Sequence, residues 1–357
     1  MISMKYGLIY YRNTTNIGDD ILSYAGKRFL PRTDYFIDRE EMDVFIPEER
    51  EYVAAILNGW YLHYSYAFPP SPYLLPLFTG THFNRDTTIF GDYSYLDGNV
   101  TDYLRKNGPV GGRDTQTVKV LSEKGIDSYY SGCLTLTLPK YDDVQPSHAI
   151  ILTDVSDEIV SYVQTLLPDK NIIRRTHNLK PEDVGADWPE REARVEAYLK
   201  DYQAADLVIT TRLHCALPSA ALGTPVILVG RFDEDYYDRL KDFAEYCACY
   251  SEEDILNGKA QEAICRPAGN KSIRPLADKI TECCRNFIYR TSHEKYDISQ
   301  LPEPALYKEL FVERTQHMRR ALNKLIGIRY SLEKQHVQDT ATMERVLAAA
   351  QKLLNMK

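Results

Sequence analysis

Short apolar runs alternate with amphipathic stretches along most of the chain. In residues 206–229 an apolar run at 207–209 is followed by a polar turn, a small-residue helix at 215–222 and a second apolar run at 226–229. Gly223 marks the end of that helix. Short continuous apolar runs are typical of strands buried in a parallel sheet. The pattern therefore predicts a strand–helix–strand unit of an α/β fold.

The same alternation occurs twice, on either side of a polar connection at 140–147. The first series predicts strands at 5–11, 35–37, 52–57 and 126–130, with helices at 21–30 and 115–124. The second adds strands at 149–153 and 171–175 and helices at 157–167, 190–205 and 273–289. We expect two doubly wound Rossmann-like domains, 1–143 and 144–292, facing a ligand cleft in a glycosyltransferase-B-like architecture.

Two regions depart from the alternation. Residues 58–82 are aromatic and interrupted by proline, which predicts a long ordered loop in which Trp60 and His63 stack on a sugar ring; the alternative is a covering flap. Residues 293–357 form a helical extension with ten Lys/Arg and five Asp/Glu from position 305 onward. We expect this tail to pack across the two domains, and the alternative is docking to an anionic membrane surface or a partner subunit.

Composition narrows the class of protein. A net charge of −8 gives no reason to expect nucleic acid as a partner. No apolar run approaches the roughly 20 residues of a membrane span, and the N-terminus does not resemble a signal peptide. The seven cysteines form no CxxC pair, so free thiols are expected and no metal site. These features favour a cytoplasmic enzyme, with the inner face of the membrane as the alternative location.

Polar residues that suit an anionic ligand follow the predicted strands. Thr211, Arg212 and His214 follow the strand at 207–209, where the next helix points its free amides. Arg113 follows a glycine turn and would supply a second cation facing Arg212. The alternative for each is an ordinary surface or helix-terminal residue.

The loop after the first strand is the third candidate. Asn16, Gly18 and Asp19 lie between a strand and a helix, as in loops that hold phosphates, although the loop has neither a GxGxxG nor a Walker pattern. Helix capping by Asn and Asp is the alternative.

Taken together, four segments resemble the polysaccharide pyruvyl transferase family in order and spacing. They are residues 13–22 (NTTNIGDDIL), 109–117 (PVGGRDTQT), 130–138 (YSGCLTLTL) and 210–228 (TTRLHCALPSAALGTPVIL), and the resemblance covers roughly the first 290 residues. It implies transfer of the enolpyruvyl group of phosphoenolpyruvate onto a sugar hydroxyl pair, as a ketal, on surface or capsular polysaccharides. It also implies that Arg113, Arg212, Leu213 and His214 hold the donor. Gly112 departs from the Ala or Cys common in the family.

This chemistry assigns further roles. His214 suits the general acid that protonates the methylene carbon of the donor, and Asp19 suits the base for the sugar hydroxyl. Phosphoenolpyruvate is the donor substrate and no cofactor is required. The acceptor sugar, its attachment to a lipid and the oligomeric state stay open. The alternative function is a glycosyltransferase using a nucleotide sugar, with the acidic residues 233–235 on the ribose.

Overall fold

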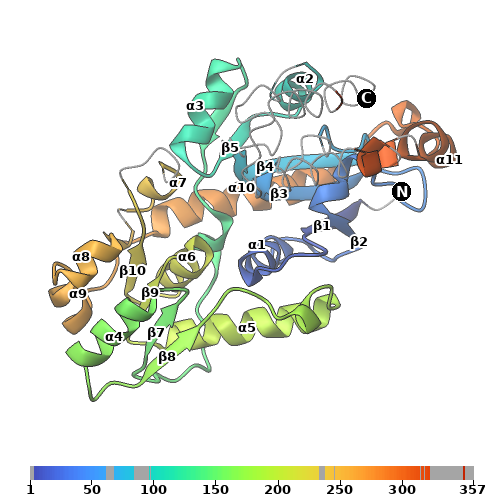
Figure 1. The fold of residues 1–357 in the computed structure, drawn as a ribbon. Helices are drawn as coiled ribbons and strands as arrows, with labels where there is room; N and C mark the ends of the chain where they lie inside the picture. Colours follow the sequence, from blue (N-terminus) through green and yellow to red (C-terminus); the bar gives the residue numbers. More distant parts are fainter. Residues whose placement is uncertain are drawn as a thin grey trace.

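The strands form two parallel sheets in this computed structural model, which describes residues 4–61, 68–83, 96, 98–232, 238–244, 246–313, 315, 316, 318–321 and 349 (Figure 1). The first sheet has the order β2-β1-β3-β4-β5-β6, and its strands are β1 (Lys5–Tyr10), β2 (Tyr35–Asp38), β3 (Val53–Tyr61), β4 (Leu74–Phe83), β5 (Val110–Gly112) and β6 (Ser128–Tyr130). The second has the order β11-β10-β9-β7-β8, with β7 (Ile150–Thr153), β8 (Ile172–Arg175), β9 (Leu207–Thr210), β10 (Val226–Val229) and β11 (Ala248–Tyr250). Both orders place the first strand between the second and the third, which creates a switch point beside it.

Helices connect the strands and cover the sheets. They are α1 (Ile17–Lys27), α2 (Asn99–Lys106), α3 (Thr115–Glu123), α4 (Asp157–Leu166), α5 (Trp188–Ala204), α6 (Leu213–Ala221), α7 (Asp238–Lys241), α8 (Glu252–Leu256), α9 (Gln261–Cys265), α10 (Arg274–His293) and α11 (Pro304–Tyr307). Short helical turns add η1 (Arg39–Val44), η3 (Leu134–Thr137), η4 (Pro181–Asp183), η6 (Ile298–Gln300) and η7 (Lys308–Val312). The prediction of an α/β fold is confirmed.

Alternation of side chains along the strands divides the core into three layers. In β7, Ile151 faces a central cluster that contains residues of both sheets, whereas Ile150 and Leu152 face the outer cluster of the second sheet. In β3, Ala54 and Ile56 belong to the central cluster, whereas Val53, Ala55 and Leu57 belong to the outer cluster of the first sheet. Successive strand residues point to opposite faces, so an all-apolar strand is covered on both sides. The central layer is therefore one hydrophobic core shared by both sheets.

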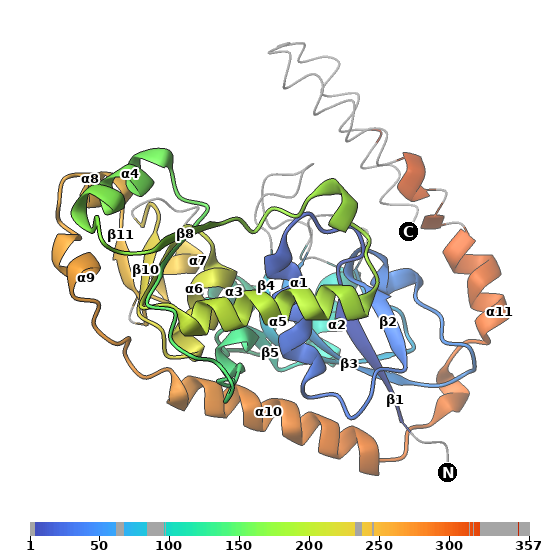
Figure 2. The ribbon, with the colours of Figure 1, turned by 90° about the horizontal axis from the view of Figure 1, so that it is seen from below.

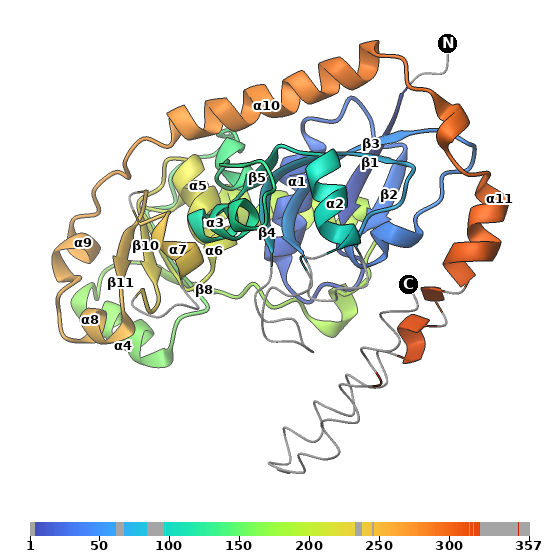
Figure 3. The same ribbon diagram turned by 90° about the horizontal axis from the view of Figure 1, so that it is seen from above.

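The helix α10 runs along one side of the molecule, past α5 and the strands of the first sheet (Figures 2 and 3). It contacts β3, β4 and η3 of the first sheet's half, and its buried side chains Ala277, Ile280 and Phe287 belong to the shared central core. The apolar stripe of this helix therefore completes the core that the two halves share.

Backbone hydrogen bonds also join the two halves, at the loop before α1. The Ile17 amide donates to the His177 carbonyl at 2.9 Å, and the Leu179 amide donates to the Thr15 carbonyl at 2.8 Å. Asn16 and Asn178 form an antiparallel bridge, while α1 packs on α5 and α6 (Figure 2). The loop that was expected to face a ligand is thus also a joint between the halves.

The prediction of a long loop at 58–82 is wrong at both of its ends, and residues 62–67 lie outside the described residues. Strand β3 continues to Tyr61, and β4 pairs with it in parallel from Leu74 to Phe83 despite Pro76. Strand β5 pairs with β4 at Thr81, so Pro76 lies where β4 has only β3 beside it and a missing amide is tolerated. The helix predicted at 21–30 also begins earlier, at Ile17.

The described part of the C-terminal tail packs on the first sheet's half. Tyr307 donates its hydroxyl to the Asp43 carbonyl at 2.9 Å, and Arg319 forms an ion pair with the Asp43 carboxylate. These residues contact the first half only, so packing across both halves stays a prediction, and residues 322–348 and 350–357 of the predicted extension lie outside the described ranges. None of the described helices has the length and hydropathy that crossing a bilayer requires.

Candidate active site

The second sheet carries a paired arginine at its switch point. Asp154 follows β7 and Arg212 follows β9, the adjacent strand. The Arg212 Nε donates to Asp154 Oδ2 at 2.8 Å, and its Nη2 donates to Asn178 Oδ1 at 3.1 Å. The exposed Thr211 donates its hydroxyl to the Asp154 carbonyl at 2.8 Å. Two partners therefore fix the partly exposed Arg212 side chain at the edge where ligands bind in such sheets.

His214 lies in the first turn of α6, directly beside the loop before α1. The helix begins at Leu213, so the prediction that it starts at residue 215 is corrected. Leu213 packs in the shared core, whereas His214 is only partly buried. A Cβ on Gly18 would lie 3.1 Å from His214 Cβ and 3.4 Å from His177 Nδ1. The absence of a side chain at Gly18 therefore allows the two halves to meet at these histidines.

His177, which the sequence did not single out, is a buried residue of this group. Its Nε2 lies 2.8 Å from the Tyr202 hydroxyl, and its amide donates to Asp154 Oδ2 at 2.9 Å. Burial lowers its pKa to about 4, Arg212 adds to this effect, and Asp154 opposes it. Its Nδ1 is buried and hydrogen-bonds to no described residue. His177 is therefore a neutral imidazole with one unused ring nitrogen.

The carboxylate of Asp154 organises this cluster. Burial raises its pKa, but hydrogen bonds from Thr176, the His177 amide and Arg212 outweigh burial and lower it below the ordinary value. Its backbone has a φ of 53°, a left-handed conformation that Asp adopts more readily than most residues. An ionised Asp154 thus holds both Arg212 and the loop that carries His177.

Arg113 follows β5 at the corresponding edge of the first sheet. Its side chain is 1% exposed, and Nε, Nη1 and Nη2 are all buried without a hydrogen bond to any described residue. The neighbouring Asp114 instead accepts from the Thr117 amide at 2.8 Å and pairs with His82 Nδ1 at 2.6 Å. Burial would raise the pKa of Asp114, but His82, the charge of Arg113 and the Thr117 amide together outweigh it, and the pKa falls to about 2. Arg113 is therefore not an ordinary surface residue, but a buried cation whose guanidinium hydrogen-bonds to no described residue.

Asp19 lies in the electrostatic range of Arg113. Burial raises its pKa, while Arg39, a hydrogen bond from Thr14 and the charge of Arg113 oppose the rise. The Thr14 hydroxyl donates to Asp19 Oδ2 at 2.6 Å. The capping alternative is correct for Asn16, whose side chain accepts from the Gly18 amide at 3.0 Å. Asp19, by contrast, faces the buried cations.

Arg39 is a second residue of this group that sequence reasoning missed. Its guanidinium lies 4.3 Å from the ring centroid of Tyr11, pairs with Glu40, and donates from Nη1 to the Trp60 carbonyl at 2.8 Å. The Trp60 ring meets His82 edge-on with centroids 5.3 Å apart. Trp60 is thereby connected through His82 and Asp114 to the neighbourhood of Arg113. His63 and the acidic residues 233–235 lie outside the described residues.

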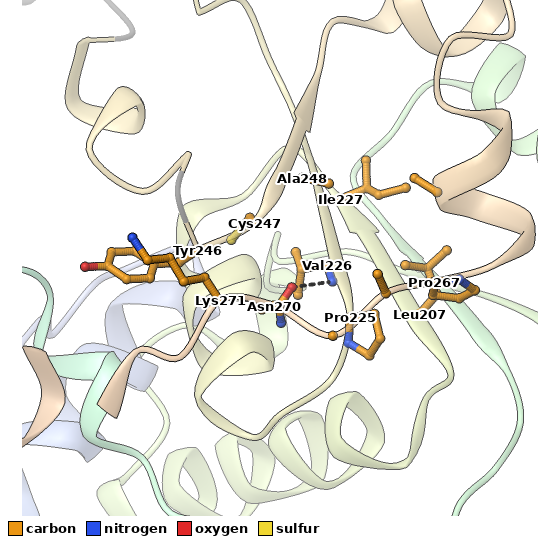
Figure 4. A pocket seen from close by; sticks show the side chains of 13 residues that line it. Leu207, Pro225, Val226, Ile227, Tyr246, Cys247, Ala248, Pro267, Asn270 and Lys271 are labelled. Atoms are coloured by element: carbon orange, nitrogen blue, oxygen red, sulfur yellow. Dashed lines mark hydrogen bonds between the residues drawn. The ribbon is translucent and has the colours of Figure 1, made fainter. Parts of the chain in front are cut away.

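A cavity of about 250 Å³ in the second half lies away from these residues (Figure 4). It is lined by Leu207, Val226 and Ala248, which begin β9, β10 and β11, and Asn270 spans it to the Val226 amide. This is the amino edge of the sheet, opposite Arg212. Since ligands of parallel sheets bind at the carboxyl edge, the cavity is not part of the candidate site.

Comparison with known proteins decides the family. The sequence model described as "Polysaccharide pyruvyl transferase" matches residues 16–233, more than half of the chain. The chain belongs to the polysaccharide pyruvyl transferase family. The matched segment of this pyruvyl transferase family member contains Arg39, Arg113, His177, Arg212 and His214. Among curated proteins, no significant match to the sequence is found.

Solved structures give only distant likenesses. An uncharacterised protein KP1_0663 from Klebsiella pneumoniae subsp. pneumoniae NTUH-K2044 is 13% identical, covering 68% of this chain and 88% of its own, with a TM-score of 0.41. A UDP-N-acetylglucosamine 2-epimerase is 12% identical over 83% and 99% of the two chains, with a TM-score of 0.39. The wall teichoic acid polymerase TagF is 10% identical over 88% and 89%, with a TM-score of 0.33. TM-scores below 0.5 support no inference about function.

Proposed function

We propose that this chain transfers the enolpyruvyl group of phosphoenolpyruvate onto a sugar diol of a surface or capsular polysaccharide precursor, forming a ketal. The observation that carries the proposal is Arg113, a guanidinium that is 1% exposed and has no hydrogen-bonding partner among the described residues. Burying a guanidinium without hydrogen-bonding partners costs several kcal/mol of folding free energy, and a bound ligand of opposite charge offsets this cost. An anionic substrate removes that cost when it binds.

The donor suits the two arginines. Phosphoenolpyruvate carries a phosphate and a carboxylate close together, and an arginine binds either anion with a pair of parallel hydrogen bonds. Arg113 would bind one anion as its first partner. Arg212, already oriented by Asp154 and Asn178, would bind the other. In this proposal Thr211, Asn16 and Gly18 line the path between the two arginines, and the Gly18 amide holds the Asn16 side chain in place.

The reaction assigns one proton donor and one acceptor. His214 gives a proton to the methylene carbon, which makes the adjacent carbon an electrophile that a sugar hydroxyl attacks. Asp19 takes the proton of that hydroxyl, and the raised pKa of Asp19 suits a base that works near neutral pH. The bond to phosphate then breaks, the second hydroxyl attacks the same carbon to close the ketal ring, and the proton of that hydroxyl passes to the departing phosphate. The arginines stabilise the charge on the leaving phosphate.

In this proposed function the two halves of the chain bind different substrates. Residues 1–143 form the acceptor side, with Trp60 and His63 beside the sugar, and residues 144–292 form the donor side of a glycosyltransferase-B-like cleft. Residues 293–357 are an extension whose basic part would allow peripheral contact with an anionic membrane. The enzyme would work in the cytoplasm, where phosphoenolpyruvate is available, and needs no cofactor or metal.

Thermal stabilisation by ligands tests the proposal. Phosphoenolpyruvate should raise the melting temperature, because a ligand that binds only the folded state stabilises it. Nucleotide sugars should not. The response should vanish in Arg113→Met and persist in Arg105→Met, a matched change of an exposed arginine on α2. A response to nucleotide sugars alone would instead support the glycosyltransferase function.

A further inference from the structure

A cavity of about 720 Å³ lies between the first two strands and the beginning of α5. Tyr10 and Phe36 come from β1 and β2, and Trp188 is the first residue of α5, so both halves of the chain form its wall. We propose that this cavity binds a neutral sugar ring of the acceptor glycan, at a position next to the sugar that is pyruvylated. The inference rests on the proposed function and deepens it.

Three aromatic rings form one continuous wall of the cavity. The centroids of Tyr10 and Phe36 are 5.8 Å apart, and those of Phe36 and Trp188 are 6.0 Å apart. Phe36, in the middle, is 47% exposed, although large apolar side chains in strands are usually covered. A pyranose ring has apolar C–H faces that pack on such rings, while its hydroxyls reach polar groups at the edge. The exposed face of Phe36 therefore suits a sugar.

The charged groups around these rings favour a neutral ligand. Lys27 Nζ lies 2.6 Å from Glu192 Oε2, and Arg191 Nη1 lies 3.1 Å from Asp20 Oδ1. Arg12 is 3.7 Å from Asp38 and 3.5 Å from Glu41. Each cation of the cavity thus already has a carboxylate partner, in contrast to Arg113. Sugar hydroxyls can bridge such pairs, whereas a phosphate would have to displace the carboxylates.

Arg191 connects the cavity to the helix that carries the proposed catalytic base. Arg191, which lines the cavity, also donates to the Tyr11 carbonyl at 2.8 Å. Its ion-pair partner Asp20 follows Asp19 in α1. The cavity is therefore joined through Arg191 to the Tyr11 backbone and to α1, the helix that carries Asp19. A site of this kind would raise affinity for a chain of sugars over a single sugar.

The test measures glycan binding and donor binding separately on the full chain. The glycan probes are arrayed neutral oligosaccharides of glucose, galactose, mannose and N-acetylhexosamines. Wild type, Phe36→Ala and Tyr289→Ala are compared, Tyr289 being an exposed aromatic residue on α10 outside the cavity. We expect wild type and Tyr289→Ala to bind the same oligosaccharides, and Phe36→Ala to bind them roughly tenfold more weakly or worse. The melting-temperature response to phosphoenolpyruvate should be equal in all three.

A fluorescence measurement locates the bound glycan. The chain has two tryptophans, so Trp60→Phe leaves Trp188 as the reporter. Its emission should change on addition of an oligosaccharide found on the array and should not change with UDP. Absence of binding to every neutral oligosaccharide, equal binding by Phe36→Ala, or a response of Trp188 to UDP alone would each overturn the inference. Loss of the phosphoenolpyruvate response in wild type would instead refute the proposed donor, and that result is independent of glycan binding.

Discussion

Arg113 and Arg212 each follow the carboxyl end of a parallel strand, in two sheets with related strand orders, yet their surroundings differ. Arg212 is partly exposed and held by Asp154 and Asn178. Arg113 is buried, and its guanidinium hydrogen-bonds to no described residue. The first is an arginine whose position is fixed before a ligand arrives. The second is an arginine near the charges of Asp19 and Asp114 whose hydrogen-bond donors are left for a ligand.

The two arginines should therefore contribute differently to the stability of the empty protein and to ligand binding. A paired charge contributes to the folded state without a ligand, whereas a buried unpaired charge destabilises it and gains most on binding. Removing each arginine should therefore have opposite consequences for the empty protein, although both changes weaken donor binding.

The largest expected effect is that of Arg113→Met. We expect kcat/KM for phosphoenolpyruvate to fall on the order of 10³-fold, since truncating a buried charge that pairs with a ligand costs roughly 2–5 kcal/mol. The melting temperature of the empty protein should rise, because an apolar side chain of similar length replaces an unpaired charge. Steady-state kinetics and calorimetry measure the two quantities. A fall in melting temperature equal to that of Arg212→Met would contradict the contrast.

The next effect is that of His214→Gln. The amide can still hydrogen-bond to the donor but cannot supply a proton, so turnover should fall on the order of 10²-fold while donor binding is kept. Single-turnover kinetics and the melting-temperature response separate the two. Near-normal turnover would mean that the proton comes from another group.

A smaller effect is expected for Asp154→Asn. Asparagine tolerates the left-handed backbone at this position and keeps the shape of the side chain, but it loses the charge that holds Arg212. The KM for phosphoenolpyruvate should rise about tenfold with little change in kcat. An unchanged KM would show that Asn178 alone positions Arg212.

The smallest effect concerns stability against pH. His177 has a pKa of about 4 when folded, below its ordinary 6.5, so it stays neutral while the unfolded chain takes up a proton as the pH falls below 6.5. The contribution of His177 to the free energy of unfolding is therefore fully present above pH 6.5. It is lost as the pH falls towards 4, by about 2 kcal/mol at pH 5. Urea unfolding at pH 7.5 and 5.0 should show a smaller difference for His177→Gln than for wild type.

Asp20 has the opposite effect on the pH dependence of stability, so the effect of His177 has to be isolated by comparing wild type with His177→Gln. Burial raises its pKa to about 6, against the lowering effect of Arg191. Its protonation in the folded state therefore recovers stability as the pH falls below 6. This contribution is shared by wild type and His177→Gln and cancels in their difference. Equal pH dependence of the two proteins would count against a neutral buried His177.

The strands with continuous apolar runs could be predicted from the sequence, whereas β4 could not. Runs such as 207–209 and 226–229 are apolar on both faces because both faces are covered, and this gives a strong signal. Strand β4 contains Pro76 and follows a segment rich in tyrosine and proline. Only its pairing with β3 along one side makes the proline acceptable, and that pairing is a tertiary property.

The residues of the candidate site could likewise be predicted from the sequence only in part. Arg113, Arg212 and His214 were found because they follow predicted strands at the carboxyl edge. The same rule would have found His177, which lies just beyond the strand predicted at 171–175. Arg39 had no such signal, since Arg39–Glu41 looks like a solvated charged run. Its place against Tyr11 depends on the extension of β3 to Trp60, which the sequence did not reveal.

The contact of the two halves at Gly18 also bears on cooperativity. The amides of Ile17 and Leu179 donate across the joint, and one hydrophobic core continues beneath it. Opening the halves here would break these bonds and expose that core, so partial opening costs nearly as much as unfolding. The two sheets should therefore melt in one transition, with the Ile17 amide exchanging its hydrogen as slowly as the amides of the central strands.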